Sequence, residues 1–450
     1  MNIKSGISRR KFVASATSSA FAFDIIPSRL LGADAPSNKL NIAGIGVGGM
    51  GAGNLNACRN ENIVALCDVD ESYAGKTFKK YAGAKVYKDY RVMLEKQKDI
   101  DAVVIATPDH THAVITMAAM QAGKHVYCQK PLTHTVKEAR MITEAAKKYK
   151  VQTQMGNQGH SSEPIRLLRE WVQSGSLGEV KEVHAWSDRP IGRPWYANFA
   201  VRDLPKEFPA VPATLDWDLW LGPAKDRKYH PAYVPFKWRG WLDYGTGALG
   251  DMGCHILDPA FWALDLGHPA SIHAEVEHVK PELASEVFPI SSKIVYEFPQ
   301  RGKLPPLKLT WTDGHYEKQR PKVIEEGRKM PASGAVIYGD KETVIHDSHG
   351  AGGLRIIPET RMQAFTRPEK TIARVKGGHE GDWIRSCKDG NPASSNFGYG
   401  GALTEFVLLG VAAARVPGEK LEWSGEQMRF TNNDKANEFV HTPYRKGWVL

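Results

Sequence analysis

The chain has 450 residues, of which 42% are hydrophobic and 24% are charged, an ordinary composition for a globular protein with more than one domain. Its formal net charge of +9 comes from scattered Lys and Arg residues rather than from a basic stripe, which argues against nucleic-acid binding. The five cysteines show neither CxxC spacing nor a disulfide framework, and no run of about 18 apolar residues predicts a membrane span.

Residues 1–35 are predicted to form an export signal. The pair Arg9-Arg10 precedes a stretch of small residues, and residues 33–35 have the A-x-A pattern of a signal-peptidase site. The string SRRKFVA resembles the twin-arginine export motif, whose pathway carries folded proteins to the periplasm. Pro36 argues against cleavage at this position, and an uncleaved segment would tether the protein to the membrane. The alternative interpretation is a cytoplasmic protein with a chance arginine pair.

A glycine-rich turn follows the first predicted strand, Leu40–Ala43. Its G-x-G-x-x-G pattern allows a tight turn and a close approach of the backbone to a pyrophosphate, which the N-terminus of the next helix then faces. The second predicted strand ends at Asp68, where a carboxylate would bind the ribose hydroxyls and repel a 2′-phosphate, so NAD is favoured over NADP. The alternative is a glycine-rich turn beside a surface aspartate. The residues predicted to contact the dinucleotide in these two segments are Gly44, Gly46, Gly48, Gly49, Met50 and Asp68.

Strands and helices continue to alternate, which predicts a doubly wound parallel sheet and a Rossmann domain over residues 38–160. Cofactor contacts belong at the carboxyl ends of such strands. His110 and His112 are two residues apart, a spacing that could suggest a metal site. Two histidines at a helix start without further ligands more often cap the helix or contact solvent, so no metal site is predicted. The further cofactor contacts expected in this domain are Thr107, Pro108, His112, Gln129, Lys130 and Gln158.

The pattern changes after about Glu179, and residues 161–450 are predicted to form a second α/β domain. The runs EVKEVHAW, ASIHAEVEHV, SKIVYEF and LKLTWTD alternate in polarity and are interpreted as antiparallel strands of a large, mostly antiparallel open sheet. A helix is expected over about Gly253–Leu266, between the first two of these strands. Near the end, the segment Gly401–Val416 is predicted to be a helix, and its nearly apolar part, Phe406–Val411, predicts that it is buried between domains or subunits.

The ordered motifs GIGVGGMG, ATPDHTH, CQKPLT and GALGDMGCHILD resemble those of the glucose–fructose oxidoreductase and inositol dehydrogenase (Gfo/Idh/MocA) family. The resemblance implies a Rossmann domain followed by an α/β domain whose open sheet serves in oligomerisation, here as a homodimer or homotetramer. It also implies hydride exchange between a nicotinamide and a polyhydroxylated ring. The family's E-K-P motif is Gln129-Lys130-Pro131 in this chain, with the lysine kept and a neutral amide in place of the acid. The family often has this X-Pro bond in the cis form.

The resemblance assigns the chemistry to three side chains, Lys130, Asp251 and His255. Asp251 and His255 are four residues apart, which places them on one face if the segment is helical. His255 would take the hydroxyl proton, Asp251 would orient or polarise it, and Lys130 would bind the same oxygen. A structural hydrogen bond at a helix start is the alternative for a lone His–Asp pair. Asp258, further along the same predicted helix, is interpreted as structural.

Substrate contacts are expected in segments rich in aromatic and hydrogen-bonding residues. Aromatic rings beside polar side chains suit carbohydrate rings, which are apolar on their C–H faces and polar at their edges. Any one tryptophan is more often a core or interface residue, and only the clustering favours sugar binding. The substrate candidates, in addition to Lys130, Asp251 and His255, are Asn157, His160, Trp186, Arg193, Trp195 and Arg239.

The leading hypothesis is an exported, NAD-dependent oxidoreductase that acts on a hydroxyl of a sugar, glycoside or cyclitol. Free dinucleotide is scarce outside the inner membrane, so the cofactor is expected to stay bound through the cycle. The main alternative is an NAD-dependent glycosidase, in which transient oxidation of the ring permits elimination, water adds and the hydride returns. Lys130 favours the oxidoreductase, because the hydrolases of the family usually depart from the lysine of the E-K-P motif. A third hypothesis is a binding or sensing protein with an inactive site.

Overall fold

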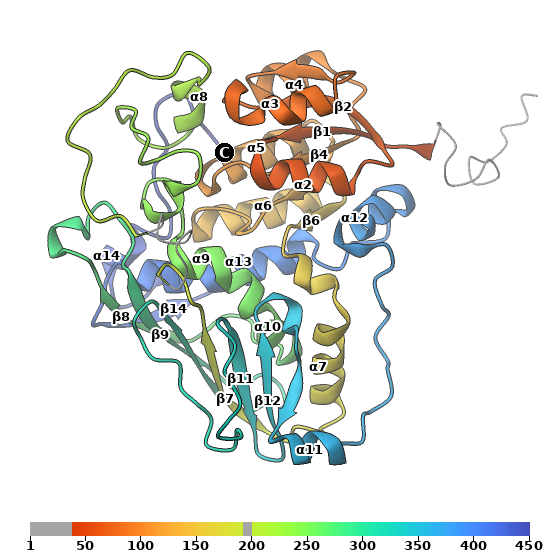
Figure 1. Ribbon diagram of the computed structural model, residues 1–450, viewed down its shortest axis with the longest axis vertical. Helices are drawn as coiled ribbons and strands as arrows, with labels where there is room; N and C mark the ends of the chain where they lie inside the picture. Colours follow the sequence, from red (N-terminus) through yellow and green to blue (C-terminus); the bar gives the residue numbers. More distant parts are fainter. Residues whose placement is uncertain (1–37, 192–199) are drawn as a thin grey trace, which may run out of the picture. The chain divides into compact units, whose positions relative to one another are not determined.

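The computed structural model describes residues 38–191 and 200–450, and Leu40–Leu450 forms one compact unit (Figure 1). The predicted signal segment, residues 1–35, lies outside the described residues, as do the substrate candidates Arg193 and Trp195.

The N-terminal half of this unit contains a six-stranded sheet in the order β3-β2-β1-β4-β5-β6, with every neighbouring pair parallel. Its strands are β1 (Asn41–Ile45), β2 (Asn62–Cys67), β3 (Lys85–Tyr87), β4 (Ala102–Ile105), β5 (His125–Cys128) and β6 (Thr153–Met155). The intervening helices are α2 (Gly49–Ala57), α3 (Glu71–Lys80), α4 (Tyr90–Lys96), α5 (Asp109–Gln121) and α6 (Val136–Tyr149). The predicted doubly wound parallel sheet is thereby confirmed.

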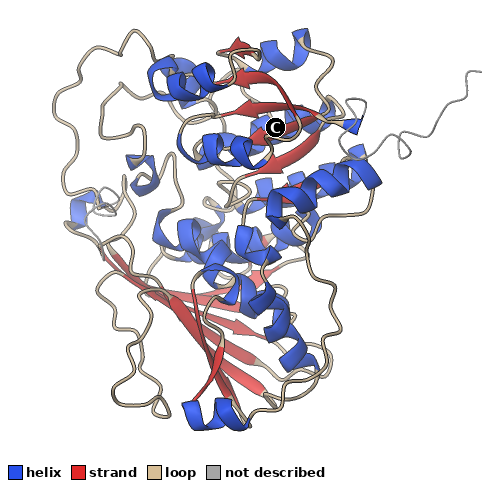
Figure 2. Ribbon diagram, turned by 45° about the vertical axis from the view of Figure 1, so that its right-hand side comes forward, coloured by secondary structure: helices blue, strands red, loops and turns tan. Residues whose placement is uncertain are grey.

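The sequence of each element explains its place in this sheet. The central strands β1 and β4 are apolar along almost their whole length and are buried, as expected where helices cover both faces of a parallel sheet (Figure 2). Helix α6 begins with a capping box in which Thr135 and Glu138 satisfy each other's backbone N–H groups. It ends at Lys150, which takes the left-handed conformation that stops a helix.

The second sheet has nine strands in the order β13-β12-β11-β7-β10-β9-β8-β14-β15. They are β7 (Val180–Trp186), β8 (Ser271–Glu277), β9 (Ser291–Phe298), β10 (Leu307–Asp313), β11 (Gly334–Gly339), β12 (Thr343–Asp347), β13 (Arg355–Ile357), β14 (Lys420–Ser424) and β15 (Arg429–Phe430). The sheet is mostly antiparallel, as predicted, but β7 and β10 pair in parallel, with Lys308 opposite Glu182. Parallel neighbours need a long crossover, and residues 187–306 provide one between these two strands.

The remaining helices connect and cover the sheets. They are α7 (Glu163–Gln173), α8 (Trp217–Leu221), α9 (Gly247–Ile256), α10 (Asp258–Ala263), α11 (Glu359–Ala364), α12 (Gly378–Asp389), α13 (Phe397–Ala413) and α14 (Asp434–Asn437), with 3-10 turns η3 (Gln158–Ser161), η5 (Lys237–Gly240), η6 (Pro281–Leu283) and η7 (His349–Ala351). The single helix predicted over Gly253–Leu266 is in fact two helices, α9 and α10. Pro259 is the reason, because it has no N–H to donate to the carbonyl oxygen of His255 four residues earlier, whereas proline is well tolerated in the first turn of the new helix α10.

Helix α13 lies between the layers of the two sheets, as its apolar sequence predicts (Figure 1). On one side Thr143 of α6 donates a hydrogen bond to the carbonyl oxygen of Phe397 (3.1 Å). On the other side Phe406 packs on Tyr296 of β9, with ring centroids 4.7 Å apart, and on Phe261 of α10. None of the helices in the described part of the chain is long and apolar enough to cross a membrane.

Candidate active site

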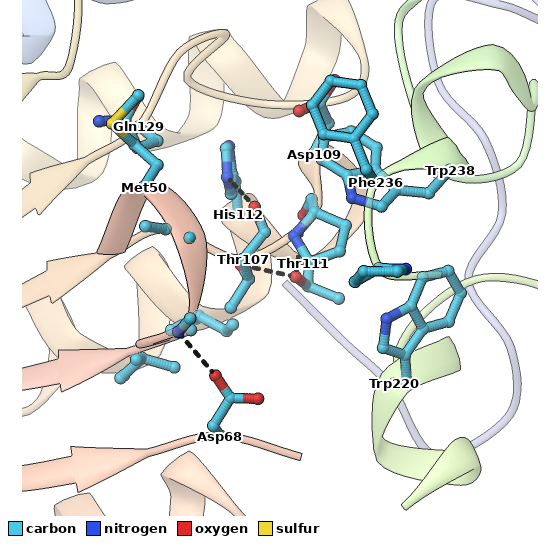
Figure 3. A pocket seen from close by; sticks show the side chains of 18 of the residues that line it. Met50, Asp68, Thr107, Asp109, Thr111, His112, Gln129, Trp220, Phe236 and Trp238 are labelled. Carbon is cyan, nitrogen blue, oxygen red and sulfur yellow. Dashed lines mark hydrogen bonds between the residues drawn. The ribbon is translucent and has the colours of Figure 1, made fainter. Parts of the chain in front are cut away.

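A cavity of about 670 Å³ lies at the carboxyl ends of the strands in the first sheet. The glycine-rich turn after β1 and the ends of β2, β4 and β5 form one side, and the segment from α8 to η5 forms the side across from them (Figure 3). Helix α9 and the turn η7 also contribute to its lining. Ligands of α/β folds bind at this edge of a parallel sheet, so the cavity is the candidate active site.

The glycine-rich turn has the shape that a dinucleotide site requires. Gly46 has a φ of +75°, and a Cβ there would lie 2.8 Å from the backbone of Ala106. A Cβ on Gly51, in the first turn of α2, would lie 1.9 Å from the carbonyl oxygen of Gly46. Glycine at both positions therefore lets α2 begin directly against the turn, with its N-terminus at the cavity. Gly44 packs beneath the turn against Leu55. The predicted contacts that line the cavity here are Gly46, Gly48, Gly49 and Met50.

Asp68 lies directly after β2 and supports the same turn. Its Oδ2 accepts hydrogen bonds from the backbone N–H groups of Val47 (2.8 Å) and Gly48 (3.3 Å), and its Oδ1 accepts one from Asp70 (3.0 Å) (Figure 3). Burial raises the pKa of Asp68, while these backbone hydrogen bonds oppose the shift. The carboxylate thus stabilises the turn and also lines the cavity.

His110 and His112, at the start of α5, are buried rather than capping or solvent-facing, which corrects the prediction. The ring nitrogens of His112 contact the carbonyl oxygens of Pro131 and Thr107, both at 2.8 Å. A neutral imidazole has a single N–H and donates to only one of these carbonyl oxygens, whereas a protonated ring donates to both. Burial lowers the pKa of His112, but contacts that include these two carbonyl oxygens outweigh it and raise the pKa. His112, Thr107 and Pro108 all line the cavity, as expected.

Gln129, which replaces the acid of the family motif, connects β5 to α2. Its amide nitrogen donates a hydrogen bond to Oδ1 of Asn54 (3.0 Å), and Asn54 in turn donates one to Glu380 (2.8 Å). Gln129 also lines the cavity (Figure 3). The Lys130–Pro131 bond is cis, as the resemblance implies.

Lys130, Asp251 and His255 line the same cavity. The Lys130 ammonium donates hydrogen bonds to Oδ1 of Asp251 (2.9 Å) and to its carbonyl oxygen (2.7 Å). Asp251 and His255 lie one turn apart in α9, and both are buried. The structure therefore brings together the three side chains to which the resemblance assigns the chemistry.

Positive charge dominates around Asp251. Arg189 contacts its carboxylate, and Nε of Arg239 lies 3.5 Å from Oδ1. Burial lowers the pKa of Lys130 from 10.5 to about 7, and Arg239 and Arg189 add to the shift. Burial also lowers the pKa of His255 well below 6.5, with Lys130 adding to the effect. A neutral amine is therefore accessible near pH 7, whereas the His255 ring is uncharged there.

Asn157 and His160 lie outside the cavity lining, in contrast to their prediction as substrate contacts. Asn157 donates a hydrogen bond to Oδ2 of Asp258 (3.1 Å), and Nδ1 of His160 lies 2.9 Å from Oδ1 of the same carboxylate. The reason is that both side chains are engaged with Asp258, whereas Gln158, which lies between them in the chain, lines the cavity. The buried Asp258 has the structural environment that was predicted for it.

Trp186 also lies outside the cavity lining. It donates a hydrogen bond to the carbonyl oxygen of Pro331 (3.0 Å) and packs in a separate cluster with Ile324 and Val336. Among the described substrate candidates, those that line the cavity are Lys130, Arg239, Asp251 and His255, and the predicted cofactor contact Gln158 lines it as well.

Several other lining residues were not predicted from the sequence. Trp220 and Phe236 come from the segment from α8 to η5, and His110 holds α8 through its contact with the carbonyl oxygen of Trp220 (3.0 Å). The repeated aromatic residues of that segment are the signal that could have revealed it, since Trp217 and Trp220 stack with ring centroids 4.7 Å apart. Tyr73, His349 and Trp448 are isolated in the sequence and belong to no pattern.

Two family models match consecutive parts of the chain. Residues 40–157 match the Gfo/Idh/MocA model described as oxidoreductase family, NAD-binding Rossmann fold. Residues 161–302 match the companion model described as oxidoreductase family, C-terminal alpha/beta domain. The two matches together extend over more than half of the chain.

Individual relatives have dehydrogenase names. Inositol 2-dehydrogenase of Salmonella paratyphi B is 32% identical over 146 residues, which cover 31% of this chain and 43% of that protein. D-glucoside 3-dehydrogenase of Escherichia coli K12 is 28% identical over 243 residues, which cover 53% of this chain and 58% of that protein. The chain thus spans about half the length of these curated relatives. A solved inositol dehydrogenase homolog from Azotobacter vinelandii, complexed with NADH and myo-inositol, has the same fold, with a TM-score of 0.56 at 18% identity over 86% of this chain and 98% of that one.

Proposed function

Because this chain belongs to the Gfo/Idh/MocA oxidoreductase family, we propose that it transfers hydride between NAD and a hydroxyl of a sugar, glycoside or cyclitol. The observation that carries the proposal is the position of Lys130, Asp251 and His255 in the same cavity as the glycine-rich turn. The names of the matched relatives, inositol 2-dehydrogenase and D-glucoside 3-dehydrogenase, support this substrate class.

The lining of the cavity fits a dinucleotide. A pyrophosphate binds backbone N–H groups that no Cβ shields, and Gly46, Gly48 and Gly49 offer such a surface at the start of α2. Asp68 would bind the adenosine ribose and repel a 2′-phosphate, which favours NAD over NADP. When bound, the nicotinamide supplies the acceptor for the hydride that leaves the substrate carbon.

The charges in the site favour Lys130 as the group that takes the hydroxyl proton, in place of His255. A base works best when its pKa lies near the working pH, and burial lowers the pKa of Lys130 to about 7. His255 is a weaker base, because burial lowers its pKa well below 6.5. We assign His255 the role of a neutral hydrogen-bonding partner of the same hydroxyl. Asp251 orients the lysine through its hydrogen bond of 2.9 Å.

We further propose that NAD stays bound through the cycle and that the protein acts in the periplasm. Trp220, Phe236 and Trp238 line the cavity across from Asp68 and Met50 (Figure 3), and a cofactor between these two sides would be shielded from solvent. An enzyme that works away from the cytoplasmic dinucleotide pool needs this retention. The twin-arginine pattern in residues 1–35 supports export in the folded, loaded state.

A homodimer or homotetramer that uses the second sheet is also proposed. Exposed ion pairs cross that sheet, among them Lys308–Glu182 (3.8 Å) and Lys293–Glu275 (3.0 Å). A subunit contact over these strands would be polar and sensitive to salt. Sedimentation velocity at low and high salt gives the assembly and its salt dependence together.

The first experiment uses freshly purified protein. The protein is denatured and the released nicotinamide dinucleotide is quantified; in parallel, nicotinamide absorbance of the intact protein is followed as single sugars, glycosides and cyclitols are added. We expect near-stoichiometric NAD that becomes and stays reduced with one class of substrate. Lys130→Met, which removes the amine but keeps an unbranched apolar side chain, should retain the dinucleotide and lose the reduction.

Two other outcomes would change the assignment. Bound NAD with release of a free sugar from a glycoside and no lasting reduction would favour the glycosidase mechanism, in which the hydride returns to the same substrate. A protein that neither contains nor binds a dinucleotide would contradict both enzymatic proposals and leave the binding-protein hypothesis.

A further inference from the structure

His349 lies against His255 inside the cavity. The centroids of the two imidazole rings are 4.1 Å apart and their planes are inclined by 32°. His255 belongs to α9, whereas His349 belongs to the turn η7 between β12 and β13, so the contact joins two distant parts of the chain. His349 also lies beyond residue 302, where the matches to the family models end.

The position of His349 is built into the fold. The next residue, Gly350, has a φ of +57°, and a Cβ there would lie 2.0 Å from the carbonyl oxygen of Gly159. Ser162 donates a hydrogen bond to the carbonyl oxygen of Gly350 (2.7 Å), which fixes η7 against the segment that follows β6. Ser348 lies 2.7 Å from Nδ1 of His349 and restrains the ring. The imidazole is therefore held in the cavity by backbone contacts as well as by its own hydrogen bond.

Few groups around His255 would stabilise a positive charge on its ring in addition to the charges already present nearby. The chargeable groups that act on it from neighbouring elements are Lys130, His349, Arg189 and His379, and all of them oppose its protonation. Asp251, on the same helix, is hydrogen-bonded to Lys130. Nδ1 of His255 has no hydrogen-bond partner among the described residues. Two imidazoles at this distance, beside those cations, cannot both carry a proton at moderate pH.

We propose that His349 is a positioning residue of the active site: it forms a stacked imidazole pair with His255 that holds at most one proton, so that His255 meets the substrate hydroxyl as a neutral hydrogen-bonding ring. The role of His255 in this statement rests on the proposed function. The pairing itself does not depend on the proposed function, because the two rings lie against each other in the protein without any substrate.

The coupling predicts a reciprocal effect on titration. Removing either ring removes a like charge from the other, so each remaining imidazole should accept a proton more readily. Burial lowers the pKa of both rings, and Lys130 and Arg189 lower it further in each case. The side chain of His349 is partly exposed to solvent, whereas that of His255 is buried, so His349 should take the single proton first as the pH falls.

The test is an NMR titration of the full chain labelled with ¹³C at the histidine ε1 position, between about pH 5 and pH 8. Of the two paired rings in the wild-type protein, the His349 signal should move first as the pH falls, and the His255 signal should start to move only at lower pH. In His349→Phe, which keeps a stacked ring without a titratable group, and in His349→Gln, the His255 signal should start to move at a pH that is higher by about half a unit or more. His255→Asn should raise the His349 titration by the same amount. His315→Gln, at an exposed histidine outside the cavity lining, should change neither signal.

Activity separates this inference from the proposed function. If the wild type reduces its NAD with a sugar, the two His349 variants should raise KM or lower kcat by about tenfold while they retain the dinucleotide. Independent titration of the two rings, with His255 unmoved in both folded His349 variants, would overturn the pairing. A wild type that reduces no NAD would contradict the proposed function, and the titration would still decide the pairing.

Discussion

Lys130 is the side chain whose ionisation should control the pH dependence of the reaction. Burial and two neighbouring guanidinium groups, Arg239 and Arg189, lower its pKa from 10.5 to about 7. The neutral amine accepts a proton and the ammonium does not, so the rate of hydroxyl oxidation should rise with pH up to about 7 and level off above it. Stopped-flow measurement of the reduction of bound NAD as a function of pH gives this rising limb of the pH–rate profile.

Lys130→Arg is the matched control for that prediction. A guanidinium keeps the positive charge but stays protonated over the whole accessible range, so the variant should lose at least about 100-fold in rate and show no limb near pH 7. An unchanged limb in Lys130→Arg would assign the titration to another group, such as Asp109, whose pKa burial raises.

Asp68 should decide between the two dinucleotides. Asp68→Asn keeps an oxygen that accepts the backbone hydrogen bonds of the turn, but it removes the charge that would repel a 2′-phosphate. We expect affinity for NADP relative to NAD to rise by about tenfold, as measured by calorimetry on dinucleotide-free protein. Asp101→Asn is the control, because it also removes one carboxylate charge, but close to the other end of β1, where Asp101 accepts a hydrogen bond from the backbone of Asn41. This variant should leave the relative affinity for NADP and NAD unchanged.

At the scale of elements, the start of α10 depends on a buried polar network rather than on apolar packing alone. Asp258 is fully buried and is contacted by Asn157, His160 and Tyr399. His160→Ala would leave this carboxylate without one of its partners and should destabilise the fold by about 3–5 kcal/mol. Because His160 lies outside the cavity lining, KM for the sugar should stay within about twofold of the wild type.

Thermal unfolding and steady-state kinetics on the same preparation distinguish a structural role of His160 from a role in substrate binding. Tyr399→Phe is the milder comparison, since it removes one hydroxyl and should cost about 1–2 kcal/mol. A His160→Ala protein with unchanged stability but a strongly raised KM would return His160 to the substrate pocket, as the sequence analysis proposed.

The elements differ in how far their sequences specify them. The first sheet could be predicted because glycines and apolar runs follow a fixed order, and a polar residue at the cavity follows β2, β4 and β5. The break between α9 and α10 was missed because the apolar pattern continues across Pro259. The parallel pairing of β7 with β10 was missed because the alternation of polar and apolar residues does not reveal the direction of a strand relative to its neighbour. His349 could not be predicted, since a lone histidine becomes a site residue only through the backbone contact of Gly350 with Gly159.

At the scale of the whole molecule, the cavity is assembled from segments that are far apart in the chain. The glycine-rich turn and Trp448 line the same cavity, and they are separated by almost the entire sequence. The Trp448 ring contacts Tyr90, with ring centroids 6.5 Å apart, and the Arg91 guanidinium lies 4.8 Å from its centroid. The C-terminal segment is therefore part of the cavity, and local sequence gives no sign of it.

Arg445 holds that C-terminal segment in place and should control how long NAD stays bound. Its guanidinium donates hydrogen bonds to the carbonyl oxygen of Gly222 (3.0 Å) and to Asp226 (3.0 Å), and it also contacts Asp218 at the base of α8. Arg445→Ala releases both α8 and the segment that carries Trp448. Because these segments cover the cavity, we expect bound NAD to dissociate about tenfold faster while the rate of the first reduction changes little.

The measurement is the loss of bound NAD into an excess of labelled dinucleotide. Arg429→Ala is the matched control, because Arg429 forms an exposed pair with Asp434 (3.2 Å) and such pairs contribute at most about 1 kcal/mol. Equal dissociation rates in both variants and the wild type would show that retention comes from the glycine-rich turn alone. Faster dissociation in Arg445→Ala only would show that the distant end of the chain, rather than the Rossmann fold itself, makes the cofactor resident.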